Sequence, residues 1–152
     1  MPAVVGQPAP DFSLRDQSNK TVSLADLKGQ KALIVFIPFP FTGTCDGEAC
    51  ALRDDLGALE GLGAKVVIIT VHAGPTNRKW AEEYKLQFPV LTDFWPHGAV
   101  AQAYGAFNEQ IGSAVRQSFV LDQNGVVREI VKSEQLGQAR EHQAYARALA
   151  AI

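Results

Sequence analysis

The feature that most constrains the fold of this chain is a pair of unbroken apolar runs. Residues 32–37 read ALIVFI and residues 65–71 read KVVIITV, and neither run alternates between apolar and polar positions. A strand with one solvated face alternates, whereas a strand that is covered on both faces is apolar throughout. The two runs therefore predict central strands of a sheet that carries helices on both faces.

The segment between these two runs predicts a helix over residues 46–62. Its apolar side chains recur every three or four residues, which is the spacing of one buried helical face. They are Ala49, Leu52, Leu56, Leu59 and Leu62. A strand, a helix and a strand in this order predict two parallel strands joined by a right-handed crossover.

Shorter segments complete the order of elements. We expect an N-terminal hairpin (12–14 and 21–24), helices at 76–86, 97–104 and 138–151, an extended piece at 89–91, and a hairpin (118–122 and 126–131) around an Asn-Gly turn. This order predicts an α/β, thioredoxin-like three-layer fold with a mixed central sheet and an N-terminal β-hairpin. At roughly 150 residues per domain, residues 1–152 are expected to form a single domain.

Composition limits the partners that we expect. Fourteen Lys and Arg residues are interspersed with sixteen Asp and Glu residues, for a net charge of −2, so nucleic acid is not an expected partner. Residues 1–10 lack a basic start and an apolar core of the signal-peptide kind, and the longest apolar runs are about half of a membrane span. We therefore expect a cytoplasmic protein without a membrane partner.

The segment that carries chemistry is PFPFTGTC, residues 38–45, which begins where a predicted central strand ends and stops where a helix begins. Loops at the carboxyl ends of strands bind ligands in open α/β sheets. Cys45 is expected at a helix N-terminus, where unpaired N–H groups and the helix dipole favour the thiolate, which is the nucleophilic form. The position predicts a reactive cysteine.

The surrounding charges indicate that Cys45 needs a cation from elsewhere in the fold. Asp46 and Glu48 bring negative charge close to the sulfur, and like charge disfavours ionisation. Arg116 precedes a predicted strand and is the candidate. No histidine lies within twenty residues of Cys45, so a protease-like Cys-His pair has no local support.

A zinc site is disfavoured by spacing. Cys45 and Cys50 form a C-x4-C pair at the edge of the usual ligand spacing, no second pair exists, and the three histidines are far apart in the sequence. We expect neither a metal nor a cofactor.

The pattern Pro38-x-x-x-Thr42-x-x-Cys45 at the end of a strand resembles the signature of the peroxiredoxins, and the resemblance runs from Val5 through Ala150. Flanking segments are similar to the alkyl hydroperoxide reductase E branch of actinobacterial peroxiredoxins. They are DFWPHG (93–98), AYG (103–105), FNE (107–109) and Arg116.

The resemblance implies a role for each matching residue. Cys45 would be the peroxidatic cysteine that attacks H2O2, an organic hydroperoxide or peroxynitrite and becomes a sulfenic acid. Thr42 would bridge the thiolate and the peroxide with its hydroxyl group, and Pro38 would shield the sulfur from water. Arg116 would hydrogen-bond the thiolate and the substrate oxygens, and Glu48 would orient Arg116.

Cys50 departs from that branch, which works with a single cysteine. Its spacing looks like the bacterioferritin comigratory protein branch, in which a second cysteine on the same helix resolves the sulfenic acid as an intramolecular disulfide. A disulfide would suit thioredoxin or a glutaredoxin-like reductant. A lone sulfenic acid would suit a mycoredoxin-like protein or a low-molecular-weight thiol, and then Cys50 would be non-catalytic.

Helix geometry adds a condition to that disulfide. If residues 45 and 50 both lie in a helix, their Cα atoms are roughly 8.6 Å apart. A disulfide needs about 4.4 to 6.8 Å. The helix would therefore have to melt locally over residues 45–51 before the bond could close.

Other functions remain open at this point. A thioredoxin-like dithiol oxidoreductase shares the fold class but needs C-x-x-C, and a non-enzymatic binding module would not need Thr42, Cys45 and Arg116 together. We call residues 38–42 the active loop. Aromatic side chains near this loop must be covered by a substrate tail or by a second subunit. We expect a homodimer whose interface includes Phe41, Phe94 or Trp95.

Overall fold

The structure is a computed structural model that describes residues 2–152, and it is built on one mixed seven-stranded sheet with the strand order β2-β1-β5-β4-β3-β8-β9. The strands of this sheet are β1 (Ser13–Arg15), β2 (Thr21–Ser23), β3 (Lys31–Phe36), β4 (Ala64–Thr70), β5 (Val90–Thr92), β8 (Gln117–Leu121) and β9 (Val127–Lys132). A separate ribbon consists of β6 (Phe107–Asn108) and β7 (Ser113–Ala114).

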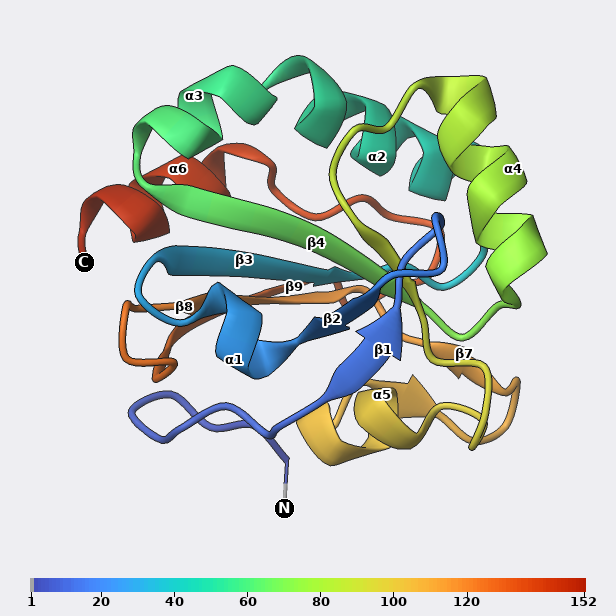
Figure 1. The fold of residues 1–152 in the computed structure, drawn as a ribbon, viewed down its shortest axis with the longest axis horizontal. Coiled ribbons are helices and arrows are strands. Elements are labelled where there is room, and N and C mark those ends of the chain that lie inside the picture. The colour runs from blue at the N-terminus through green and yellow to red at the C-terminus, as the bar shows by residue number, and fades with distance from the viewer. Residues whose placement is uncertain (1) are drawn as a thin grey trace.

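Helices cover both faces of the sheet (Figure 1). They are α1 (Leu24–Leu27), α2 (Gly43–Asp54), α3 (Leu56–Gly61), α4 (Gly74–Tyr84), α5 (Ala99–Tyr104) and α6 (Gln143–Ala150). One buried cluster lies under α1 and α5, and a second lies under α2, α3, α4 and α6. The three-layer α/β arrangement expected from the sequence is confirmed.

The two apolar runs form the centre of the sheet. Strands β3 and β4 pair in parallel, with Leu33 opposite Val66, and nearly every side chain in both strands is buried. The N-terminal hairpin and the β8–β9 hairpin pair antiparallel. Because β3 and β4 run in the same direction, the loops that follow them meet at one edge of the sheet.

The helix expected over residues 46–62 differs from the structure in two ways. It begins three residues earlier, because Thr42 takes the extended N-cap conformation and α2 starts at Gly43. It is also interrupted at Asp55, which separates α2 from α3. Cys45 is therefore the third residue of the helix and lies within its first turn.

The expected helix over residues 138–151 is wrong in its first part, since α6 begins only at Gln143. In the non-helical segment the backbone N–H and the side chain of Arg140 both bind Glu48. Those long-range bonds compete with a helical conformation that the alanine-rich sequence alone favours. The short elements α1, β6 and β7 were not predicted either.

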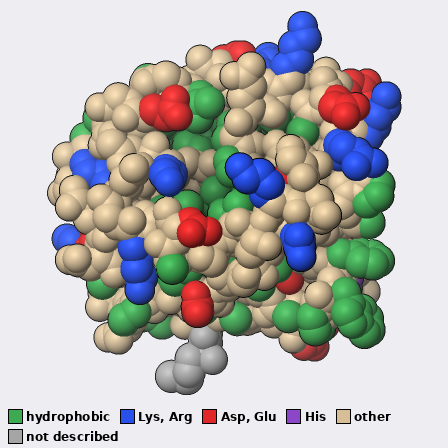
Figure 2. All heavy atoms as spheres, in the orientation of Figure 1, with side chains coloured by type: hydrophobic (Ala, Val, Ile, Leu, Met, Phe, Trp, Pro, Cys, Tyr) green, Lys and Arg blue, Asp and Glu red, His purple; other side chains and the backbone are tan. Residues whose placement is uncertain are grey.

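Exposed apolar side chains gather at one end of the molecule, at the lower right of Figure 2 and close to β7 in Figure 1. Among the large hydrophobic side chains of the described chain, Trp95 is 83 % exposed and Phe94 is 51 % exposed. Phe41, on the active loop, is 43 % exposed. Across residues 2–152, no helix has the length and apolar character that crossing a membrane requires.

Candidate active site

The Cys45 thiol is fully buried near the end of β3, beneath the first turn of α2. The backbone N–H of Phe39 donates a hydrogen bond to its Sγ atom over 3.4 Å. Ala49 and Leu52, one and two turns further along α2, belong to the same buried cluster as Cys45. The sulfur is therefore shielded from solvent by the loop and by the first turns of α2.

The loop before α2 is held by short polar contacts. The Thr42 hydroxyl donates to the Phe39 carbonyl over 2.6 Å, and Thr42 itself is exposed. Pro38 is buried, and its carbonyl oxygen accepts a hydrogen bond from Nε2 of His72 over 3.1 Å. Both side chains named from the sequence, Pro38 and Thr42, therefore lie on the loop that covers the sulfur.

Sequence reasoning weighed His72 only as a metal ligand and did not connect it with the loop before Cys45, because the two are far apart along the chain. His72 follows β4 by two residues, and Pro38 follows β3 by two residues. Neighbouring parallel strands place such residues at the same sheet edge. The strand pattern alone could therefore have predicted that His72 lies near Pro38, although His72 and Cys45 are far apart along the chain.

Glu48 lies between two arginine side chains, on the side of α2 that faces away from α4. Arg116 donates to its carboxylate from Nη1 over 2.5 Å. Arg140 donates from Nε over 2.8 Å, from Nη2 over 2.7 Å and from its backbone N–H over 2.9 Å. The structure thus joins Arg116 to Glu48 and adds Arg140, which no sequence pattern indicated.

The electrostatic balance of this cluster keeps the carboxylate charged. Burial alone would raise the pKa of Glu48, but the hydrogen bonds and charge of Arg140, together with the charge of Arg116, hold that pKa below its ordinary value. Two guanidinium groups against one carboxylate leave the cluster positive. Within residues 2–152, the hydrogen bond to the Cys45 sulfur comes from the Phe39 N–H, and neither guanidinium group is bonded to it.

Asp46 faces the other way, toward α4. Its carboxylate accepts hydrogen bonds from Nε1 of Trp80 over 2.7 Å, from the Tyr84 hydroxyl over 2.7 Å and from the Phe41 backbone N–H over 3.0 Å. The bond to Asp46 raises the pKa of Tyr84 to about 12. These donors fasten the first turn of α2 to α4 without neutralising the charge of Asp46.

Cys50 lies one and a half turns after Cys45 in the same unbroken helix and is half-buried. Both cysteines are free thiols. The structure shows α2 helical across both residues. In a regular helix their Cα atoms are roughly 8.6 Å apart, so a disulfide between them would require this part of the helix to unwind. The structure represents the state before any bond between them.

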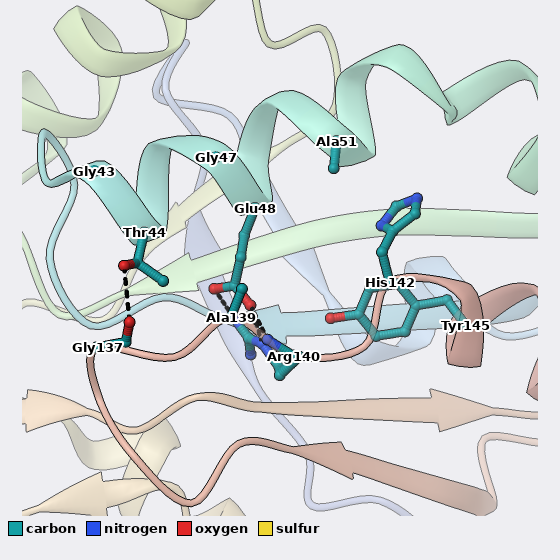
Figure 3. Close-up of a pocket in the computed structure, with 10 residues that line it drawn as sticks. All are labelled: Gly43, Thr44, Gly47, Glu48, Ala51, Gly137, Ala139, Arg140, His142 and Tyr145. Carbon is teal, nitrogen blue, oxygen red and sulfur yellow. Dashed lines mark hydrogen bonds and ion pairs between the residues drawn. The ribbon is translucent and has the colours of Figure 1, made fainter.

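A cavity of about 520 Å³ lies along the face of α2 that carries Glu48. Figure 3 shows it between α2 and the segment that leads into α6. Its lining consists of Gly43, Thr44, Gly47, Glu48, Ala51, Gly137, Ala139, Arg140, His142 and Tyr145. Cys45 is not part of this lining. In residues 2–152, no three His, Cys, Asp or Glu side chains are grouped to hold a metal ion.

Comparison with known proteins gives the family. Residues 5–130 match the AhpC/TSA family. The chain belongs to this family. It is 46 % identical over 149 residues to alkyl hydroperoxide reductase E of Mycobacterium tuberculosis, and the match covers 97 % of each chain. It is also 35 % identical over 130 residues to a chloroplastic peroxiredoxin Q of rice, covering 85 % of this chain and 59 % of that protein.

Two solved structures agree with this assignment. AhpC of Enterococcus faecalis superposes with a TM-score of 0.89 at 25 % identity and covers 98 % of this chain and 92 % of that one. Peroxidoxin BcpB of Mycobacterium tuberculosis superposes with a TM-score of 0.84 at 28 % identity, over 97 % and 95 % of the two chains. The chain is thus a peroxiredoxin with a thioredoxin-like fold, an enzyme of the thiol-dependent peroxidase class, and the dithiol oxidoreductase alternative is set aside.

Proposed function

We propose that Cys45 is the peroxidatic cysteine, acting on H2O2, organic hydroperoxides and peroxynitrite. The observation that carries this proposal is the placement of its sulfur at the N-terminus of α2, with the Phe39 N–H directed at it. The thiolate attacks the terminal oxygen of ROOH and the O–O bond breaks. The bonding electron pair leaves with RO⁻, which is protonated to ROH, and the cysteine becomes a sulfenic acid.

The neighbouring residues would support this step in different ways. Arg116, oriented by Glu48, supplies positive charge to the thiolate and to the peroxide oxygens. Thr42 donates to a loop carbonyl in the resting state, so its hydroxyl must rotate to donate toward the leaving oxygen. Pro38, which is buried, keeps water away from the sulfur.

Cys50 is proposed as the resolving cysteine. Its sulfur attacks the sulfenic sulfur, an S–S bond forms, and hydroxide leaves and is protonated to water. Since α2 is helical across both residues, this step requires the first turns to unwind. A thiol reductant then regenerates both thiols. The candidates are thioredoxin, a glutaredoxin-like or mycoredoxin-like protein, and a low-molecular-weight thiol.

The assembly and location of the enzyme are also proposals. The exposed rings of Phe94 and Trp95, with Phe41 on the active loop, favour a homodimer in which a second copy covers them. Two free cysteines suit the cytoplasm, where thiols are kept reduced.

Intact mass spectrometry after one equivalent of H2O2 tests these assignments. We expect the wild type to lose two hydrogens as it forms the disulfide, Cys50→Ser to gain one oxygen, and Cys45→Ser to remain unchanged. Peroxide consumption by Cys45→Ser at the wild-type rate would refute its role. A stable sulfenic acid in the wild type would instead assign the one-cysteine mechanism and leave Cys50 non-catalytic.

A further inference from the structure

The peptide group between Pro38 and Phe39 is hydrogen-bonded on both sides. Its N–H donates to the Cys45 sulfur over 3.4 Å, and its carbonyl oxygen lies 3.1 Å from Nε2 of His72. A carbonyl oxygen can only accept, so Nε2 must carry the hydrogen. His72 is therefore joined to the sulfur through a single peptide group.

The His72 ring is held in place for this bond. The backbone N–H of His72 donates to the Thr70 hydroxyl over 3.1 Å, and the His72 backbone carbonyl accepts a hydrogen bond from the hydroxyl of Thr92. The ring also packs edge-on against Phe39, with 6.0 Å between the ring centroids. These contacts come from β4, β5 and the active loop, so the Nε2 donor is fixed by three neighbouring segments.

A donor on the carbonyl side of a peptide group withdraws electron density and makes its N–H a stronger donor. Within a chain of hydrogen bonds, each bond strengthens the next by about 10–30 %. The bond that benefits here is the one to the sulfur, and hydrogen bonds to a charged acceptor are stronger than neutral ones. The donor of His72 thus favours the thiolate over the thiol at Cys45.

We propose that His72 is a positioning residue of the peroxidase reaction, which acts through the Pro38–Phe39 peptide group to aim and polarise the N–H that stabilises the Cys45 thiolate. The inference rests on the proposed role of Cys45. His72 does not touch the reacting atoms, and it belongs to neither the arginine cluster nor the Asp46 contacts. Its effect on the thiolate is exerted through the Phe39 N–H bond.

Three substitutions at His72 separate a donor effect from a packing effect. His72→Leu removes the donor and keeps much of the apolar volume. His72→Gln can place an amide N–H near the position of Nε2, whereas the shorter side chain of His72→Asn cannot reach the Pro38 carbonyl. His97→Leu is a matched control, because it removes a histidine bond of the same kind, to the Gly112 carbonyl over 2.8 Å, that does not involve the Pro38–Phe39 peptide group.

The measurements are the thiolate absorbance at neutral pH and the rate constant of the first reaction with H2O2. We expect both to fall about 1.3- to fourfold in His72→Leu and His72→Asn, and to return to near wild type in His72→Gln. The control should match the wild type. Thermal unfolding of each variant verifies that the fold is intact, and if His72→Leu does not fold, the comparison of Asn with Gln decides.

Two results would overturn the inference. One is an unchanged thiolate fraction in His72→Leu or His72→Asn. The other is an equal loss of rate in all three variants without restoration by Gln, which would indicate a packing role alone. Either result leaves the wild-type reaction with peroxide intact, whereas failure of the Cys45 assignment removes the dependence on Cys45 itself. The two failures are therefore distinguishable.

Discussion

Two carboxylates in the first two turns of α2 are held in opposite ways. Asp46 and Glu48 point about 160° apart around the helix axis. Glu48 receives two guanidinium groups, while Asp46 receives an indole N–H, a phenol O–H and a backbone N–H, none of which carries a charge. The same kind of side chain thus binds two cations on one side of α2 and only uncharged donors on the other.

The two carboxylates therefore connect α2 to different parts of the structure. The Glu48 side belongs to the buried scaffold, where ion pairs link α2 to the residue that precedes β8 and to the segment before α6. The Asp46 side links α2 only to α4 and to the active loop, through single hydrogen bonds. If α2 unwinds over residues 45–51 to let Cys45 and Cys50 meet, the neutral Asp46 contacts and the Glu48 ion pairs must both rearrange, and the buried ion pairs resist that more strongly.

Glu48→Gln should have the largest effect, because it leaves two buried guanidinium groups without a counter-charge. Breaking a buried pair in this way costs about 3–5 kcal/mol of unfolding free energy, measurable by urea denaturation. Peroxidase activity should also fall strongly as Arg116 loses its orientation. A variant as stable as the wild type would show that the arginines find other partners, and that Glu48 is not needed as their counter-charge.

The same cluster predicts an acid-dependent loss of stability. The pKa of Glu48 is held below its ordinary value in the fold, so its contribution is fully present above the ordinary carboxyl range and is lost as the pH falls toward the lowered pKa. Urea denaturation of wild type at decreasing pH should show this loss. Glu48→Gln should lack that part of the pH dependence, and parallel curves for the two proteins would contradict the assignment.

The two arginines of the cluster should be separable. Arg140 also donates to the Phe36 carbonyl and to the Ser118 hydroxyl, so Arg140→Ala should lose about 3–5 kcal/mol of unfolding free energy. Arg116→Ala removes one bond to Glu48 and one to the Leu136 carbonyl and should lose less stability. It should lose more peroxide reactivity, about 10²-fold. Equal losses of both quantities in both variants would deny Arg116 its special role.

Some of these features could be predicted from the sequence, and others could not. The central strands were predictable, because burial on both faces leaves an unbroken apolar run in β3 and β4. The position of Cys45 followed from the junction between a strand and a helix. The extended path around Arg140 was not predictable, since its backbone N–H is captured by a carboxylate 92 residues away. The Asp46 charge was visible in the sequence, but its donors on α4 were not.

Asp46→Asn should have a moderate effect with the opposite sign on reactivity. The amide keeps an acceptor for the Trp80 indole but removes the negative charge beside Cys45, so the thiolate fraction should rise. The first turn of α2 should also open more easily. We expect oxidation to be no slower, and disulfide formation, followed by tryptophan fluorescence, to be faster than in wild type. A lower thiolate fraction would mean that the charge of Asp46 does not act on the sulfur.

Tyr84→Phe should have the smallest effect, and it sharpens the comparison because it removes a single neutral donor from Asp46 and leaves every charge in place. The thiolate fraction should not change, but disulfide formation should accelerate by roughly two- to fivefold, the worth of a weak hydrogen bond. Glu48→Gln, in contrast, should change both steps, because it also removes the group that binds Arg116.

The phenol also gives this variant an alkaline signature. The pKa of Tyr84 is raised to about 12 in the fold, above its ordinary value of about 10, so its bond to Asp46 stabilises the protein below the ordinary value. That stabilisation is lost as the pH rises toward 12. Urea denaturation should therefore show wild type and Tyr84→Phe converging at high pH, with wild type more stable at neutral pH. If their difference is independent of pH, the phenol does not hold α2 through the Asp46 carboxylate, and the faster disulfide step would need another cause.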